Sequence, residues 1–112
     1  MHLDFKYKTG TIANCDGILC CREETGWPTK KSDVAAGEWG SANICDLPSK
    51  TYQSMLDYIV NEVQPDLILW TGDNSAHDIY QNTQTEVIEY NQVMTQMLID
   101  AIEGHNITVL PI

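Results

Sequence analysis

Long apolar runs and basic residues are what this sequence lacks. No apolar stretch approaches the ~18 residues that a membrane-spanning helix needs. The opening stretch MHLDFKYKTG has no apolar core of the kind that a signal peptide carries, so we expect no signal peptide here. Six basic residues stand against sixteen acidic ones, which gives a net charge of −10. We therefore expect no nucleic-acid partner, because no basic patch could hold a polyanion.

Internal repeats, low-complexity segments and linker-like stretches are also missing. The 112 residues suffice for one domain core and no more. Hydrophobic residues make up 43% of the chain, which indicates a globular protein rather than a disordered one.

Four cysteines occupy the glycine-rich segment 9–47, which has little periodicity and is expected to be a long loop. A loop of this length is usually functional or disordered, and the cysteines favour order. The neighbours Cys20 and Cys21 fit a mutual disulfide badly. Two pairings remain open, Cys15–Cys20 with Cys21–Cys45 or Cys15–Cys21 with Cys20–Cys45.

Disulfides in this loop are favoured over two alternatives. A structural zinc site would use paired C-x-x-C arms, which the spacing lacks. Four free thiols would be a liability on an exposed loop. Disulfides predict an oxidising compartment. Asn106 opens an N-I-T glycosylation sequon, which agrees with secretion, although such tripeptides often arise by chance.

Helical periodicity begins at Pro48. Apolar residues at helical spacing predict a helix over 48–63, with Asp46 or Ser49 as its cap and Pro65 marking its end. A second helix is predicted over 83–103. The apolar stripe of these helices comprises Tyr52, Met55, Leu56, Ile59, Val60 and Val63 in the first, and Val87, Tyr90, Met94, Met97, Leu98, Ala101 and Ile102 in the second.

The second helix carries clear boundary signals. Thr83 and Glu86 form a capping-box pattern at its start, and Gly104 is placed to stop it. The methionines of its stripe are expected to fill the core rather than bind a ligand.

Strands are predicted on either side of the second helix. The stretch DLILW, residues 66–70, is apolar on both faces, which is typical of a parallel sheet covered on both faces. NITVLPI, residues 106–112, begins another strand, and MHLDF, residues 1–5, reads as the tail of an earlier one. This alternation predicts an α/β fold with parallel neighbours.

Two residues with metal-binding chemistry follow predicted strands. Ligands gather at the carboxyl ends of the strands in such sheets. Asp73 lies just past 66–70, His2 lies where the first strand would exit, and we expect both at one crevice. Gly72 allows the sharp turn that points Asp73 inward.

The chemistry of a metal-assisted phosphoryl transfer suits these residues. Carboxylates bridge divalent cations, imidazole suits zinc, and paired metals clamp a phosphoryl group. His77 is then the candidate acid for the leaving group, and Asp78 the natural candidate to orient its imidazole. The alternatives are a turn at Asp73, a frayed His2 at the chain start and a surface His77.

Three stretches taken together resemble the calcineurin-like metallophosphoesterase family. HLDFKYKTG (2–10) resembles its first metal motif, D-x-H-x-D, without the leading Asp. WTGDNSAHD (70–78) resembles the second motif. CDGILCCREETG (15–26) and GEWGSANICDLP (37–48) resemble the disulfide loop of the family's acid sphingomyelinase branch.

The resemblance implies a site and an activity. His2 would bind the first of two zinc ions, Asp73 would bridge both, and His77 would assist the leaving group. The disulfides would be Cys15–Cys20 and Cys21–Cys45. The implied reaction is hydrolysis of sphingomyelin to ceramide and phosphocholine by in-line attack of a metal hydroxide. The alternatives are a related phosphodiesterase acting on nucleotides or other phosphodiesters, and a non-catalytic secreted module of the same fold.

The sequence departs from the family pattern in that several of the family's metal-binding motifs are missing. The Asp before His2, the G-N-H motif and the later histidine ligands are not in the sequence. We therefore expect residues 1–112 to be an incomplete N-terminal part of a metallophosphoesterase catalytic domain, with the disulfide loop 9–47 inside it. The two zinc ions and a membrane-docking surface would be complete only in a longer protein, secreted or lysosomal.

Overall fold

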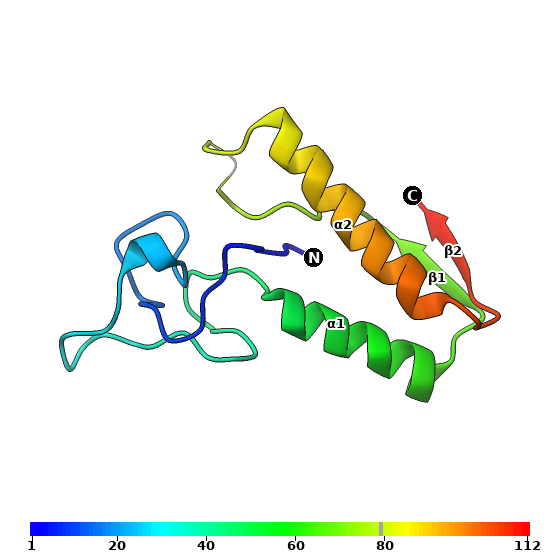
Figure 1. The fold of residues 1–112 in the computed structure, drawn as a ribbon, viewed down its shortest axis with the longest axis horizontal. Coiled ribbons are helices and arrows are strands. Elements are labelled where there is room, and N and C mark those ends of the chain that lie inside the picture. Colours follow the sequence, from blue (N-terminus) through cyan, green and yellow to red (C-terminus); the bar gives the residue numbers. More distant parts are fainter. Residues whose placement is uncertain (79) are drawn as a thin grey trace.

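The computed structural model describes residues 1–78 and 80–112, which form an α/β arrangement as predicted (Figure 1). The long loop lies at one end of the molecule, and the two α-helices and both strands lie at the other. The elements are a short 3-10 helix η1 (Glu23–Thr25), α1 (Ser49–Tyr58), a π-helical turn η2 (Ile59–Val63), β1 (Leu67–Trp70), α2 (Gln84–Ile102) and β2 (Thr108–Pro111).

The two strands are parallel neighbours, which confirms the predicted sheet type. Leu67 lies opposite Thr108, and Trp70 lies opposite Pro111. Parallel strands need a crossover connection, and α2 supplies it.

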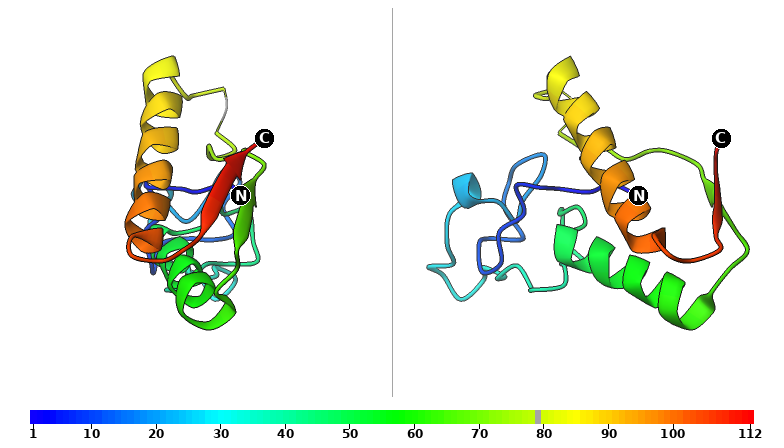
Figure 2. Two further views of the ribbon diagram at one scale, coloured as in Figure 1. Left: turned by 90° about the vertical axis from the view of Figure 1, so that its right-hand side faces the viewer. Right: turned by 45° about the vertical axis from the view of Figure 1, so that its right-hand side comes forward.

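Both helices pack on one face of this small sheet (Figure 2). Ile68, Trp70 and Val109 contact the core formed with the helices. The opposite face is open among the described residues, since Leu67 is 46% and Leu69 55% exposed. The expectation of a strand covered on both faces is therefore wrong for this structure.

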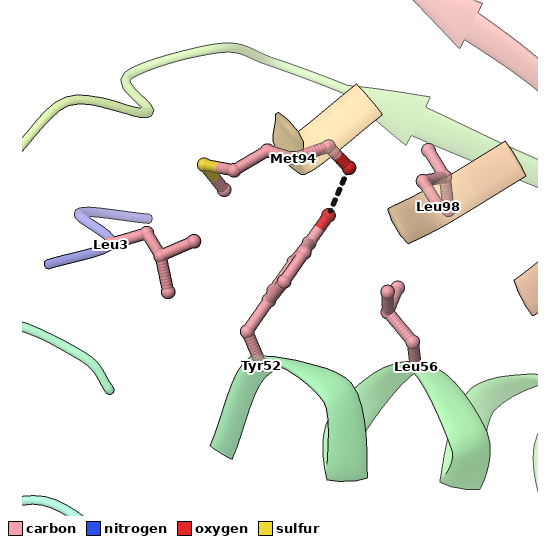
Figure 3. Packing of buried hydrophobic residues seen from close by; sticks show 5 residues of the cluster. All are labelled: Leu3, Tyr52, Leu56, Met94 and Leu98. Atoms are coloured by element: carbon pink, nitrogen blue, oxygen red, sulfur yellow. Dashed lines mark hydrogen bonds between the residues drawn. The ribbon is translucent and has the colours of Figure 1, made fainter. Parts of the chain in front are cut away.

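The core lies between α1, α2 and the N-terminal segment (Figure 3). Its buried members are Leu3, Tyr52, Leu56, Met94 and Leu98. The Tyr52 hydroxyl donates to the Met94 carbonyl at 3.2 Å, which satisfies the polar end of a buried ring. Burial raises the pKa of Tyr52 to about 12. The predicted helix stripes thus form the core, and their methionine Met94 is a packing residue.

The start of α1 differs from the prediction. Pro48 precedes the helix, and neither Asp46 nor Ser49 caps it with a side chain. The reason is that both carboxylate oxygens of Asp46 are bonded to His77. The helical run continues through η2 and ends at Gln64, whose φ of 48° is left-handed, directly before Pro65.

The boundaries of α2 agree with its sequence signals. The Thr83 hydroxyl accepts from the Glu86 amide at 3.2 Å, and the Thr83 amide donates to the Glu86 carboxylate at 2.7 Å, which completes the capping box. Gly104 follows the helix with a φ of 81°, as expected of a terminating glycine.

Residues 1–5 do not form a regular strand. Leu3 makes a single parallel bridge with Leu47, and its amide donates to the Asn74 carbonyl at 3.0 Å. The segment therefore runs between the cysteine loop and the segment that follows β1. This position, rather than sheet membership, brings His2 beside Asp73.

The loop 9–47 is ordered by disulfides and isolated bridges. Cys15 pairs with Cys20 and Cys21 with Cys45, and no described cysteine is free. The predicted disulfides are thus present, in the pairing that the resemblance implies. The loop has a small core of its own around Ala13, Cys21 and Ala36.

Neither α1 nor α2 has the length and apolarity that crossing a bilayer would require, and the same holds for the other helical turns of the described residues.

Candidate metal and phosphate site

His77 is held by a carboxylate from the far side of the disulfide loop. Its Nδ1 lies 2.6 Å from Oδ1 of Asp46, and its backbone amide donates to Oδ2 of the same residue at 2.7 Å. The Asp46 side chain is only 7% exposed, whereas that of His77 is 58% exposed. Because a carboxylate only accepts, Nδ1 of His77 carries the proton and Nε2 is left for an outside partner.

His2 is fixed in the corresponding way by the main chain. Its Nδ1 lies 2.6 Å from the Ser75 carbonyl oxygen, which also only accepts. Nδ1 therefore carries a proton, and in the neutral ring Nε2 of His2 presents a lone pair. That Nε2 lies 3.1 Å from Oδ2 of Asp73.

Asp73 reaches this position through an unusual turn at the end of β1. Gly72 and Asp73 both have left-handed backbones, with φ of 77° and 59°. An aspartate tolerates this region better than most residues, but it still carries strain of the kind found at functional sites. The expectation that Gly72 allows a sharp turn agrees with this geometry.

The two histidines lie against each other. The ring centroids of His2 and His77 are 3.7 Å apart, and the planes are tilted by 36°. The structure thus brings together all three residues singled out for chemistry, His2, Asp73 and His77.

The donor set at this place has the chemistry of a zinc site. Imidazole nitrogen and carboxylate oxygen are both zinc ligands, and at bonds of about 2.0–2.2 Å two tetrahedral ligands lie roughly 3.3–3.6 Å apart. The 3.1 Å between His2 Nε2 and Asp73 Oδ2 is slightly shorter and close to the separation of two ligands of one cation. Among residues 1–78 and 80–112, no three His, Cys, Asp or Glu side chains form a metal-binding group. His2 and Asp73 therefore fit as two ligands of a site that needs more.

A buried ion network joins the two chain segments that carry His2 and His77. Arg22 binds Asp4 through two bonds, Nε to Oδ2 at 2.8 Å and Nη2 to Oδ1 at 3.0 Å, and binds Oδ2 of Asp78 through Nη1 at 2.6 Å. All three residues are at most 2% exposed. Burial alone would raise the pKa of Asp78, but its hydrogen bond to Arg22 and the charge of that guanidinium outweigh burial and lower it.

Comparison with known proteins places this geometry in a family context. No protein-family model matches the chain. The chain is 36% identical over 98 residues to a sphingomyelin phosphodiesterase of Bos taurus, an alignment covering 88% of this chain and 16% of the bovine protein. It is 35% identical over 98 residues to the sphingomyelin phosphodiesterase of Homo sapiens, covering 88% of this chain and 15% of the human protein.

The chain is a homologue of the sphingomyelin phosphodiesterases. It spans about a sixth of the length of the curated relatives it matches. An endopolyphosphatase of Cryptococcus neoformans is also similar, at 33% identity over 89 residues and 72% of this chain. The similarity to sphingomyelin phosphodiesterases confirms the resemblance drawn from the three sequence motifs.

Sequence reasoning missed the residues that support the site. Asp46 had been expected to cap α1, and Asp78 to orient His77. The prediction for Asp78 is wrong, because Asp78 binds Arg22, and Asp46 binds the His77 ring in its place. A usable signal was the position of Arg22 and Asp46, each directly after one cysteine of the Cys21–Cys45 pair.

The apolar pocket between α1, α2 and β1 is a different place. It has a volume of about 280 Å³ and is lined by residues such as Leu56, Ile68 and Met94. His2, Asp73 and His77 do not line it. The candidate site is therefore the exposed edge beyond β1 and not this pocket.

Proposed function

We propose that this chain forms part of the catalytic centre of a zinc-dependent phosphodiesterase that hydrolyses sphingomyelin to ceramide and phosphocholine. The observation that carries the proposal is the approach of His2 Nε2 to Asp73 Oδ2 at 3.1 Å, beside the ring of His77. The names of the homologous proteins support the substrate class.

The contact between His2 and Asp73 needs a positive charge between its two atoms. The Ser75 carbonyl fixes the proton on Nδ1 of His2, so a neutral ring turns a lone pair toward a carboxylate oxygen. Two acceptors at this separation repel unless a proton or a cation lies between them. Asp73 is 74% exposed at its side chain, so a cation can reach it from solvent.

His2 and Asp73 would hold zinc through Nε2 and Oδ2. Zinc, when bound, supplies a Lewis acid for the phosphoryl oxygens and a nucleophile at neutral pH. The Ser75 carbonyl keeps the His2 ring in the tautomer that binds metal, which is the usual task of a group behind a metal ligand. Zinc fits this donor pair, and further ligands would come from outside the described residues.

His77 would handle the proton of the leaving group. Its Nδ1–H donates to Asp46, so Nε2, on the exposed side of the ring, is the atom that would carry the proton for transfer. In the doubly protonated ring, Nε2–H would protonate the departing ceramide oxygen while Nδ1–H stays bonded to Asp46. His77 is not needed as a metal ligand in this scheme.

Polyphosphate is a second candidate substrate, because relatives named endopolyphosphatase match 72% and 88% of this chain. Other phosphodiesters, nucleotides included, are a third. These candidates share the phosphoryl chemistry of the site and differ in the leaving group and in the group that stays on phosphorus. A non-catalytic module of the same fold is the alternative to all of them.

A chimera tests the proposal. Residues 1–112 would replace the matching segment of the human sphingomyelin phosphodiesterase, and hydrolysis of sphingomyelin, p-nitrophenyl phosphodiester and polyphosphate would be measured. We expect sphingomyelin hydrolysis that is lost in His2→Ala and Asp73→Asn chimeras and retained in a His105→Ala control. A folded chimera without phosphodiesterase activity, or one indifferent to His2 and Asp73, would refute the proposal.

We also propose an oxidising location, secreted or lysosomal, with Asn106 glycosylated. Two disulfides in a chain of 112 residues suit such a compartment. Asn106 is exposed in the turn between α2 and β2, where a glycan has room. Mass spectrometry of protein from a eukaryotic secretory host would show the glycan at Asn106, and an unmodified asparagine would count against it.

A further inference from the structure

Arg22 joins the two segments that carry the site histidines. Asp4 lies two residues after His2, and Asp78 lies one residue after His77. The Arg22 guanidinium binds Asp4 by two hydrogen bonds and Asp78 by a third, from 2.6 to 3.0 Å. Residues 22, 4 and 78 are thereby tied together although they are far apart in the sequence.

Arg22 itself has a fixed place. The carbonyl of its neighbour Cys21 accepts from the Lys8 amide at 2.7 Å, and the Cys21 amide donates to the Ile12 carbonyl at 3.0 Å. Cys21 is also bonded to Cys45, and its backbone is left-handed, with a φ of 62°. A residue other than glycine rarely adopts this conformation unless other contacts hold it there. The disulfide and both hydrogen bonds of Cys21 therefore fix the backbone position from which the Arg22 side chain extends.

The other cysteine of this disulfide, Cys45, directly precedes a residue that also binds His77. Asp46 follows Cys45, and its carboxylate binds the His77 ring and amide. Each cysteine of the Cys21–Cys45 disulfide is therefore followed directly by a residue that supports the site, Arg22 after Cys21 and Asp46 after Cys45. Arg22 acts on both histidine segments, whereas Asp46 acts on His77 alone.

The chemistry of the guanidinium suits a spacer between two carboxylates. It is planar and presents its donors in a rigid fork, so two carboxylates bound to it have a set separation. A lysine ammonium is a point charge without this directionality. A buried ion triad of this kind need not stabilise the folded chain, because variants with apolar residues in its place are often as stable. The effect to examine is therefore the separation that Arg22 imposes on the two carboxylates.

We infer that Arg22 is the positioning residue of the site: through Asp4 and Asp78 it sets the approach of His2 to His77. The inference deepens the proposed function and rests on it for its catalytic meaning. Among the described residues, no hydrogen bond or ion pair joins Arg22 to either histidine, so Arg22 would act through Asp4 and Asp78. A third carboxylate, Glu24, lies 3.9 Å from Nη1 of Arg22, but its side chain is exposed. The competing account is that two backbone hydrogen bonds suffice to place His2: the Leu3 amide donates to the Asn74 carbonyl, and the Leu47 amide donates to the His2 carbonyl.

The test compares four variants of the disulfide-bonded chain by NMR. Arg22→Met removes the fork, and Arg22→Lys keeps the charge without it. The triple variant Asp4→Asn, Arg22→Met, Asp78→Asn removes all three charges, so that no buried charge is left unpaired. Lys50→Met removes an exposed positive charge and its ion pair with Glu38, and serves as the control.

Two signals separate positioning from folding. Cross-peaks between the ring protons of His2 and His77 report the 3.7 Å approach of the rings. Cross-peaks between Tyr52 and Met94 report the hydrophobic core, of which Arg22 is not a member. We expect the triple variant to keep the Tyr52–Met94 signal and to lose the His2–His77 signal. Arg22→Lys should weaken the His2–His77 signal. Lys50→Met should retain both.

Zinc affinity of the same samples adds a second readout. Replacing a supporting residue behind metal ligands typically costs 10–100-fold in metal affinity, and we expect a loss of this order for the triple variant. A triple variant that keeps the histidine signal would overturn the inference. If Arg22→Met alone fails to fold, the triple variant decides. Loss of the signal when the wild-type chain binds no zinc would uphold the positioning role and count against His2 and Asp73 as a zinc-binding pair instead.

Discussion

Asp46 binds His77 with both of its oxygens, Oδ1 to the ring Nδ1 at 2.6 Å and Oδ2 to the backbone amide at 2.7 Å. The two bonds fix the ring and its tautomer together. In Asp46→Ala, the proton of the neutral His77 ring should therefore no longer be confined to Nδ1, while the chain stays folded. In ¹⁵N NMR of the imidazoles, the His77 signals should move from a single Nδ1–H form to an exchanging mixture, like that of the exposed His105. Unchanged His77 signals in Asp46→Ala would show that the carboxylate does not hold the ring.

His77→Ala should separate proton transfer from metal binding in the chimera. A general acid typically contributes on the order of 10²–10⁴-fold in rate. The ceramide oxygen is a poor leaving group and needs the proton, whereas p-nitrophenolate departs without it. We expect a much larger loss of kcat on sphingomyelin than on a p-nitrophenyl phosphodiester, at unchanged zinc content. An equal loss on both substrates would make His77 a phosphate-positioning residue, and loss of zinc would make it a ligand.

The Cys21–Cys45 disulfide should stabilise the chain more than the Cys15–Cys20 disulfide. Their sequence separations are 24 and 5. Chain entropy predicts a loss in unfolding free energy of about 3.5 kcal/mol when the longer loop is opened, and of about 2 kcal/mol for the shorter one. Denaturant unfolding of the two Cys→Ala pairs measures both. A larger loss for Cys15–Cys20 would contradict this prediction.

Acid should weaken the chain partly through Asp78. Its folded pKa lies below the unfolded value, because the hydrogen bond and charge of Arg22 outweigh burial. The stability that Asp78 contributes is therefore fully present above its unfolded pKa of about 3.9 and is lost as pH falls through the lower folded pKa. Unfolding free energy should fall less between about pH 7 and about pH 3 in Asp78→Asn than in the wild type. The exposed Asp57→Asn is the matched control, and identical slopes for Asp78→Asn and wild type would contradict the account.

The sequence predicted the regular elements well because their signals are local. Helical spacing, the Thr83–Glu86 capping box and Gly104 each act within a few residues, and the structure has them where expected. The parallel sheet followed from the alternation of helices and strands. The open face of β1 was not predicted, since apolar residues on both faces say nothing about what covers them.

The supporting contacts of the site could not be predicted in the same way. Asp46 has the sequence position of a helix cap, and only the folded loop shows that His77 takes its carboxylate instead. Arg22 pairs with residues 18 and 56 positions away. No local pattern encodes such pairings, whereas His2, Asp73 and His77 could be singled out as candidates because their motifs have a recognisable spacing.

The central claim is that His2 and Asp73 bind one zinc ion together, and a zinc titration of the chain followed by NMR tests it most directly. Two ligands bind weakly, so NMR suits the expected low affinity. The account predicts that zinc shifts the His2 Nε2 signal, that Asp73→Asn weakens the effect at least roughly tenfold because a neutral amide replaces the carboxylate, and that Asp57→Asn leaves it intact. A His2 signal indifferent to zinc, or an Asp73→Asn chain that binds as the wild type does, would contradict the account.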